Sequence, residues 1–282
     1  MSEMLATSGS LSGFVSEIAE FRGLLLPLDR WEPVRPESLR IILNHGLGAR
    51  DPSNTGHGSD NWIRLIGESA LESGLAPVLY TARGHKGSSG WEASAVAGDL
   101  EQFTWERLGG DMFSLAREHL GLDSFVVGGS SMGSATALYC VMNNPEQFFR
   151  GLILIRPPTA WETRRARKKV LQSSAKKCHQ RNVEQSEKKG GECNVSHLVL
   201  LGASESDLPS PTDSVDTTYG RVRCPTLILA IEGDETHPLE TATTLNALIA
   251  GSVLHVAKDF QEASASWPKI VREFTAALAP PL

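Results

Sequence analysis

Short apolar runs alternate with helical patterns along most of the chain. Each apolar run is bounded by turn residues, which is typical of buried strands. Such strands are expected at residues 39–46, 76–84, 123–129, 150–158, 224–234 and 251–257. Helical periodicity is found at residues 60–74, 99–121, 132–144, 238–249 and 264–279. This alternation predicts an α/β fold, with a mostly parallel sheet covered by helices on both faces.

Several polar loops follow the expected strands. Right-handed crossovers place the loops after parallel strands along one edge of the sheet, where ligands bind in such folds. The candidate chemistry therefore gathers at this edge, in residues 45–48, 83–85, 129–133 and 233–234.

One polar segment, residues 158–222, breaks the alternation. Within it, residues 162–191 contain ten basic and three acidic side chains, so this window carries a charge of +7 and the rest of the chain −13. One interpretation is a solvated helical insertion. The other is a basic lid that attracts an anionic substrate or partner.

Composition narrows the class of protein further. The chain has 282 residues and a net charge of −6, which argues against general nucleic-acid binding. No run approaches the roughly 18 apolar residues of a membrane span, and the acidic N-terminus does not resemble a signal peptide. The four cysteines form no CxxC pair, which argues against a zinc knuckle or a thioredoxin-type redox motif. The spacings of His45, His57 and His85 match no metal-binding pattern, so a metal site is not expected. We expect a soluble cytoplasmic protein with reduced thiols.

Two glycine-rich stretches are compared with three functional patterns: residues 46–51 and GGSSMGSA at residues 128–135. A phosphate-binding P-loop would need Lys where Ser134 stands. A dinucleotide-binding turn at residues 46–51 would need a third glycine where Asp51 stands. The third pattern, G-x-S-x-G, fits residues 129–133, after an apolar strand and before a helix. It predicts a nucleophile elbow that presents Ser131, although a purely structural turn remains an alternative.

Four motifs in order resemble the α/β-hydrolase superfamily, in particular its esterases, enol-lactonases and C–C hydrolases. They are NHGLG (44–48), ARGHKGS (82–88), GSSMG (129–133) and EGDETHP (232–238). The resemblance extends from about Leu39 to Leu278, apart from the insertion. It implies an α/β-hydrolase core of residues 1–157 and 223–282, with a helical cap at 158–222. It implies no cofactor.

The resemblance also implies roles for individual residues. Ser131 would be the nucleophile and Asp234 the acid of a catalytic triad. The amides of Leu47 and Met132 would form an oxyanion hole. His45 and His85 match motif histidines that usually shape loops.

The general base is the missing part. In this superfamily a histidine follows the last strand, but the loop after residues 251–257 contains none. His255 is the first choice for the base, although strand alternation favours a structural role for it. His237 lies on the loop of Asp234, but it follows that acid too closely in sequence to be oriented by it easily. His85 is a third candidate, and the absence of any base is the last possibility.

These observations predict a serine hydrolase acting on a small ester, lactone or related acyl compound. The expected partner is a small-molecule substrate, with no nucleic acid or membrane, and the sequence does not indicate an oligomeric state. The alternative is a non-catalytic relative that binds a small ligand or partner.

Overall fold

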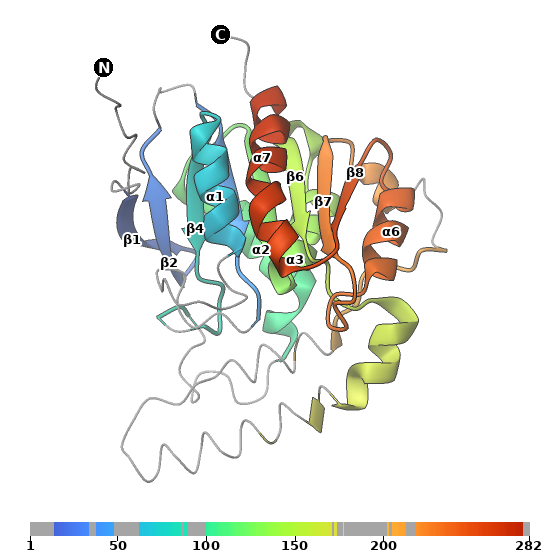
Figure 1. Ribbon diagram of the computed structural model, residues 1–282. Helices are drawn as coiled ribbons and strands as arrows, with labels where there is room; N and C mark the ends of the chain where they lie inside the picture. The colour runs from blue at the N-terminus through green and yellow to red at the C-terminus, as the bar shows by residue number, and fades with distance from the viewer. Residues whose placement is uncertain are drawn as a thin grey trace, which may run out of the picture.

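The chain is seen in a computed structural model as a layered α/β fold (Figure 1). The structure describes residues 14–33, 38–47, 62–85, 87–89, 100–170, 172–173, 177, 202, 205–212 and 218–278. The strands of these residues are β1 (Phe14–Phe21), β2 (Leu24–Trp31), β3 (Arg40–Asn44), β4 (Ala76–Tyr80), β5 (Phe125–Ser130), β6 (Phe149–Ile155), β7 (Thr226–Ile231) and β8 (Val253–Ala257).

These eight strands form one sheet in the order β1-β2-β4-β3-β5-β6-β7-β8. The pairs from β4 to β8 are parallel, while β1, β2 and β4 pair antiparallel. The expected mostly parallel sheet is therefore confirmed. Its central strands β4, β5 and β7 are buried along their whole length, because helices cover both faces.

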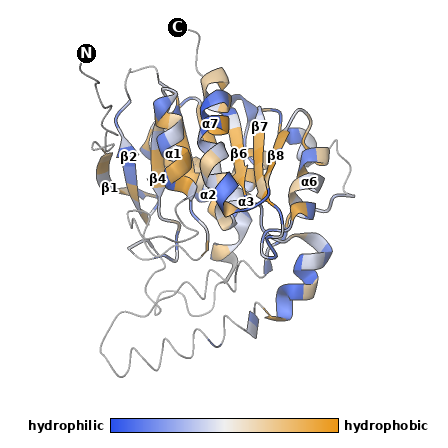
Figure 2. Cartoon of the chain, in the orientation of Figure 1, coloured by the Kyte–Doolittle hydropathy of each residue, from blue (hydrophilic) through white to orange (hydrophobic). Residues whose placement is uncertain are grey.

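Helices pack on the two faces of the sheet as separate hydrophobic clusters. The longer helices are α1 (Trp62–Glu72), α2 (Trp105–Ser114), α3 (Met132–Met142), α6 (Leu239–Leu248) and α7 (Phe260–Leu278). α1 and α7 share one cluster, and α2, α3 and α6 share the other. In Figure 1, α1 and α7 lie together in front of the sheet. Figure 2 shows the hydrophobic strands between these layers in orange.

Short helical turns complete the described part. They are 3₁₀ turns at Leu100–Phe103, Glu146–Phe148 and Tyr219–Arg221, and a π turn at Leu115–His119 that continues α2. The expected helix at 99–121 is thus three successive pieces.

An N-terminal hairpin is the element that the sequence analysis missed. It assigned no strand before residue 39, yet β1 and β2 pair through their full length. The turn between them has positive φ at both central residues, Arg22 (50°) and Gly23 (74°), which is typical of a tight hairpin. The pattern was hidden because β1 is mostly exposed, with Ile18 60% exposed, so its hydrophobic signal is weak.

The segment between β6 and β7 is only partly described. Residues 161–170 form a helix, and residues 205–212 lie against it, while most of the expected cap at 158–222 is outside the described residues. Figure 1 shows this helix in yellow-green beyond the edge of the sheet where α7 begins. Figure 2 shows it as mainly hydrophilic.

Candidate active site

Ser131 occupies a strained turn between β5 and α3. Its backbone has φ 56° and ψ −115°, a region that residues other than glycine rarely adopt. Its amide donates a hydrogen bond of 2.9 Å to the carbonyl of Ile155 in β6. The amide and the side chain of Ser134 both donate to the Ser131 carbonyl. The turn is therefore held by backbone contacts on both sides.

Two glycines make this turn possible. A Cβ at Gly129 would lie 2.4 Å from the carbonyl carbon of Gly133. A Cβ at Gly133 would lie 2.1 Å from the carbonyl oxygen of Asn44, at the end of β3. Both distances are far below van der Waals contact, and both clashes are with backbone atoms, which cannot rotate away as a side chain can. The G-x-S-x-G spacing thus has a steric cause.

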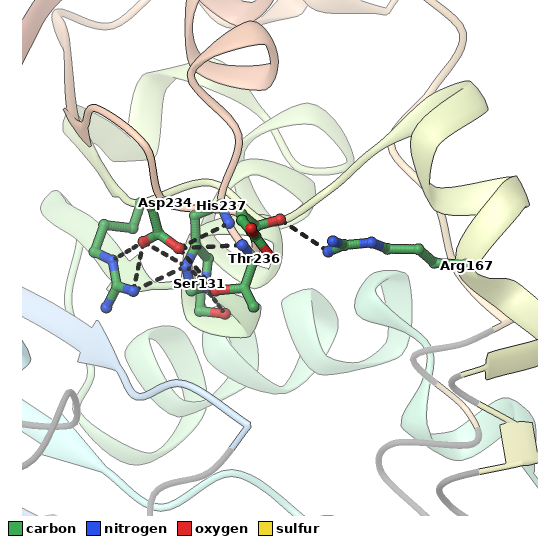
Figure 3. A network of polar contacts seen from close by, with 7 residues as sticks. Ser131, Arg167, Asp234, Thr236 and His237 are labelled. Carbon is green, nitrogen blue, oxygen red and sulfur yellow. Dashed lines mark hydrogen bonds and ion pairs between the residues drawn. The ribbon is translucent and has the colours of Figure 1, made fainter.

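His237 meets the side chain of Ser131. Its Nε2 lies 2.8 Å from Ser131 Oγ, and its Nδ1 lies 2.9 Å from Asp234 Oδ2 (Figure 3). If Nδ1 carries the proton and donates it to Asp234, the lone pair of Nε2 faces the hydroxyl. Serine, histidine and carboxylate therefore form one hydrogen-bonded chain, the geometry of a nucleophile with its base and the group that orients the base.

A tight turn explains how His237 reaches an acid only three residues before it. Asp234 Oδ1 accepts hydrogen bonds from the amide and hydroxyl of Thr236, at 3.1 and 2.8 Å. The His237 amide donates to the Asp234 carbonyl at 3.2 Å. These bonds fold the loop back on Asp234 and turn the imidazole toward Oδ2. His237 is therefore oriented by Asp234 in spite of their closeness in sequence, because the turn brings the ring back to the carboxylate.

His255 does not reach Ser131, which corrects the first choice for the base. It lies in the middle of β8, in register with Leu229 of β7. Strand alternation puts it on the same face as Ala257, which is buried in the cluster of α1 and α7. Because strand side chains stand roughly perpendicular to the sheet, that of His255 projects from this face and not toward the strand end where Ser131 stands. The imidazole that contacts Ser131 is that of His237.

Arg156 is a functional candidate that the sequence analysis missed. It follows β6, and its Nε and Nη2 donate to Asp234 Oδ2 at 2.8 and 2.6 Å. Its Nη2 also lies 2.9 Å from His237 Nδ1. The side chains of Arg156 and Asp234 are only 6% and 7% exposed. The only signal in the sequence was an arginine directly after a buried strand of this edge.

The protonation of the acid and the base follows from these contacts. Burial alone would raise the pKa of Asp234. The hydrogen bonds from Arg156, the electrostatic interaction with His237 and the hydrogen bond from Thr236 outweigh burial and lower this pKa to about 2. Burial lowers the pKa of His237, and the charge of Arg156 lowers it further, while Asp234 opposes both. At neutral pH the site therefore holds an ionised acid and a neutral imidazole, the form that can accept a proton.

His45 and His85 support the loops around Ser131, as the resemblance implied. His45 Nε2 accepts a hydrogen bond from the Ala82 amide, and its Nδ1 lies 2.8 Å from the Gly46 carbonyl. His85 Nε2 lies 3.2 Å from the carbonyl of Leu47. Burial, and then the neighbouring His85, lowers the pKa of His45 to about 3, so its ring is neutral.

The two expected oxyanion donors lie next to Ser131 in space or in sequence. A Cβ on Gly46 would stand 3.5 Å from the Cβ of Ser131, so the loop that carries Leu47 passes beside the nucleophile candidate. Met132 is the first residue of α3, where backbone amides are not used inside the helix. Gly48, the last residue of the NHGLG motif, lies outside the described residues.

The helix at 161–170 reaches the loop of the acid and the base. Arg167 Nη1 donates a hydrogen bond of 2.8 Å to the carbonyl of Glu235, between Asp234 and Thr236 (Figure 3). The same helix is tied to residues 205–209. Arg164 Nε donates to the Ser206 carbonyl, and the Trp161 ring donates to the Pro209 carbonyl. This hydrogen bond from Arg167 joins the insertion to the loop of Asp234 and His237.

Among the described residues, no group of three or more His, Cys, Asp or Glu side chains is placed to hold a metal ion. None of the helices in the described part of the chain is long and apolar enough to cross a membrane.

Comparison with known proteins identifies the fold. A family model described as alpha/beta hydrolase fold matches residues 40–176. No curated protein matches the sequence. Solved structures do match over nearly their full length. An enol-lactonase from Burkholderia xenovorans is 16% identical with a TM-score of 0.60, over 92% of this chain and 99% of that one.

Two esterases are similar to the same degree. The esterase from Exiguobacterium antarcticum is 17% identical with a TM-score of 0.62, over 93% of this chain and 98% of that one. A thermophilic esterase from Thermogutta terrifontis is 19% identical with a TM-score of 0.62, over 95% of this chain and 100% of that one. The chain therefore has the α/β-hydrolase fold, and the resemblance drawn from its four motifs is confirmed.

Proposed function

We propose that the protein is a serine hydrolase that cleaves a small ester, lactone or related acyl compound. The fold and its esterase and lactonase neighbours support a hydrolase in general. The observation that carries the serine chemistry is the pair of contacts made by His237, at 2.8 Å to Ser131 Oγ and 2.9 Å to Asp234 Oδ2. A hydroxyl is a weak nucleophile until a base accepts its proton, and this pair provides the base and its orientation.

In the proposed reaction, Ser131 Oγ attacks the carbonyl carbon of the substrate while His237 Nε2 takes the hydroxyl proton. The charge that develops on the carbonyl oxygen is held by the amides of Leu47 and Met132, the latter at the N-terminus of α3. His237 then returns the proton to the leaving oxygen. Water releases the acyl group from Ser131 by the same steps, with His237 again as the base.

The insertion at 158–222 is proposed as a cap over this site. Its support is the contact from Arg167 to the Glu235 carbonyl, which joins the helix at 161–170 to the acid–base loop. In a fold that hosts many activities, the residues around the reacting group select the substrate. The cap would therefore contribute to the choice of acyl compound.

A fluorophosphonate probe tests the proposal directly, because it reacts with serines that are activated by a base. We expect the wild-type protein to be labelled and Ser131→Ala to remain unlabelled. Ser266→Ala, at a half-buried position of α7 where the hydroxyl donates to the Glu262 carbonyl, is the matched control and should be labelled like the wild type. Folded wild-type protein that takes up no label would contradict the proposed function and favour a non-catalytic binding protein.

The substrate class is tested on the same variants. Small acyl esters, lactones and acyl thioesters are offered separately, and release of the carboxylic acid is followed. Turnover of at least one class that disappears in Ser131→Ala would support hydrolysis at this serine. Equal turnover in both proteins would place the activity elsewhere.

A further inference from the structure

We propose that Arg156 is a positioning residue of this site, whose guanidinium holds Asp234 and sets the protonation state of His237. The inference rests on the proposed function for its catalytic meaning. A triad needs only the serine, the histidine and the acid. Here a fourth, permanently charged side chain contacts two of the three.

The first argument is the number of hydrogen bonds that Asp234 accepts. Its Oδ1 accepts from the amide and hydroxyl of Thr236 and weakly from the amide of His237. Its Oδ2 accepts from Nε and Nη2 of Arg156 and lies 2.9 Å from His237 Nδ1. The imidazole therefore shares its carboxylate oxygen with a guanidinium that binds the same atom twice.

The second argument is the charge balance. Arg156 and Asp234 neutralise each other, and their side chains are 6% and 7% exposed, so water screens them little. A proton added to His237 would then leave a net positive charge in a buried site. Without Arg156, the same proton would form a neutral pair with Asp234. The guanidinium thus favours the neutral imidazole, in agreement with the lowered pKa of His237.

The third argument is that the surroundings hold Arg156 in place. Its φ is 48°, a left-handed conformation that an arginine adopts only when neighbouring structure imposes it. Its amide donates a hydrogen bond of 2.7 Å to the Leu229 carbonyl in β7. Its guanidinium lies 4.9 Å from the centre of the Phe260 ring.

The other charged side chains near His237 do not contact its ring in the described part of the chain. Within the described residues, the carboxylate that faces the ring is Asp234 and the cation that contacts it is Arg156. Arg167 approaches the same loop, but it donates to the Glu235 backbone. The Glu235 side chain is exposed to solvent. Arg156 is therefore the group to change.

The test is a pH titration of the His237 ring by NMR in the full-length protein, with His237→Asn used to assign the signal. In Arg156→Met we expect the pKa of His237 to rise by about one unit or more, because a buried positive charge has been removed. In Arg156→Lys, which keeps the charge, the pKa should stay near the wild-type value. Arg164→Met removes another buried arginine, whose contacts include Ser206 and Trp105, and should leave the pKa unchanged.

An unchanged pKa in Arg156→Met would overturn the proposal. So would an equal rise in Arg156→Met and Arg156→Lys, since that pattern would mark a packing role and not a charge role. If the methionine variant does not fold, Arg156→Gln replaces it, because its amide can still donate one hydrogen bond to Asp234. The ring titration needs no catalytic activity, so it decides on Arg156 whatever the outcome for hydrolysis.

The catalytic consequence is measured as the rate of fluorophosphonate labelling against pH. Only neutral His237 can accept the serine proton, so the rate falls as pH drops below the pKa of His237. Removing the charge of Arg156 raises this pKa and should move the acid limb to higher pH. On the new limb, a shift of one unit means labelling about tenfold slower than in the wild type. Labelled protein whose acid limb does not move in Arg156→Met would reject the role of Arg156 alone. No labelling in any protein would reject the proposed function instead.

Discussion

The loops after β5 and after β7 meet at the same edge of the sheet, yet different forces hold them. The β5 loop is a backbone device, in which Ser131 is held at a positive φ by glycines that no other residue can replace. The β7 loop is a side-chain device, in which Asp234 gathers hydrogen bonds from Thr236, His237 and Arg156. One loop presents the nucleophile candidate, and the other brings the imidazole of His237 to it.

The difference shows what each device demands from the sequence. Backbone contacts of 2.1 and 2.4 Å to a missing Cβ impose glycine at fixed positions, so the constraint is local and visible as a motif. Hydrogen bonds to a carboxylate can come from many residue types and from distant parts of the chain. Arg156, for example, lies 78 residues before Asp234. Substitutions in the two loops separate these two kinds of constraint.

Gly133→Ala tests the backbone device. Its new Cβ would stand 2.1 Å from the Asn44 carbonyl oxygen, so β3 and α3 must separate. We expect the free energy of unfolding to fall by about 3 kcal/mol or more, with loss of probe labelling at Ser131. Urea unfolding followed by circular dichroism measures the change.

Gly110→Ala is the control for this substitution. Gly110 is exposed in α2 and nothing lies within 4 Å of its Cβ position. We expect a gain of about 0.5–1 kcal/mol, because alanine favours a helix more than glycine does. A Gly133→Ala protein as stable as the wild type would show that the elbow is not sterically held.

His237→Ala and His255→Ala compare the two histidines that the sequence offered as bases. Removing His237 should lower turnover by about 10²–10⁴-fold without unfolding the protein, because Ser131 loses the group that takes its proton. Removing His255 should change turnover little, since it lies in β8 away from Ser131. The measurement is kcat/KM for an acyl ester, with thermal unfolding as the check on folding.

The reverse ranking, with His255→Ala more damaging to turnover than His237→Ala in folded protein, would contradict the assignment of the base. A chemical check is also possible. Added imidazole should restore part of the activity of His237→Ala, and it should do nothing for Ser131→Ala.

Thr236→Val tests the threonine hydroxyl of the β7 loop. The substitution keeps the shape of the side chain but removes the donor at 2.8 Å from Asp234 Oδ1, a hydroxyl that also lies 2.9 Å from His237 Nδ1. One such bond contributes about 1 kcal/mol, so turnover should fall about fivefold. Thr243→Val, on the surface of α6, loses a bond to the Glu240 carbonyl and should have no effect on turnover. Equal turnover in Thr236→Val and the wild type would mean that Arg156 and the turn backbone hold Asp234 by themselves.

The comparison also explains which predictions from sequence succeeded. The strands after β2 and the helices that alternate with them were predicted well, because their hydrophobic periodicity is strong. The hairpin of β1 and β2 was missed because β1 is largely exposed and its pattern weak. Ser131 and Asp234 were chosen from motifs, and the structure brings them to opposite sides of one imidazole.

The contacts of His237 and Arg156 could not be predicted, because they depend on distances that periodicity does not encode. His255 was favoured for its place in the chain, 21 residues after Asp234. His237 was set aside for its closeness to Asp234, yet the turn bonded through Thr236 brings them together. Arg156 belongs to no motif. Its contact with Asp234 forms because β6 and β7 are neighbours in the sheet.

Patterns along the chain were enough to predict the α/β layering, the edge where the polar loops gather and the elbow that presents Ser131. These features follow from periodicity and from glycines that sterics require, and both are local properties of the chain. Only the tertiary structure decided which histidine meets Ser131 and which cation meets Asp234. Those choices depend on pairing β5, β6 and β7 in register and on closing a four-residue turn, where side chains far apart in sequence come within hydrogen-bonding distance.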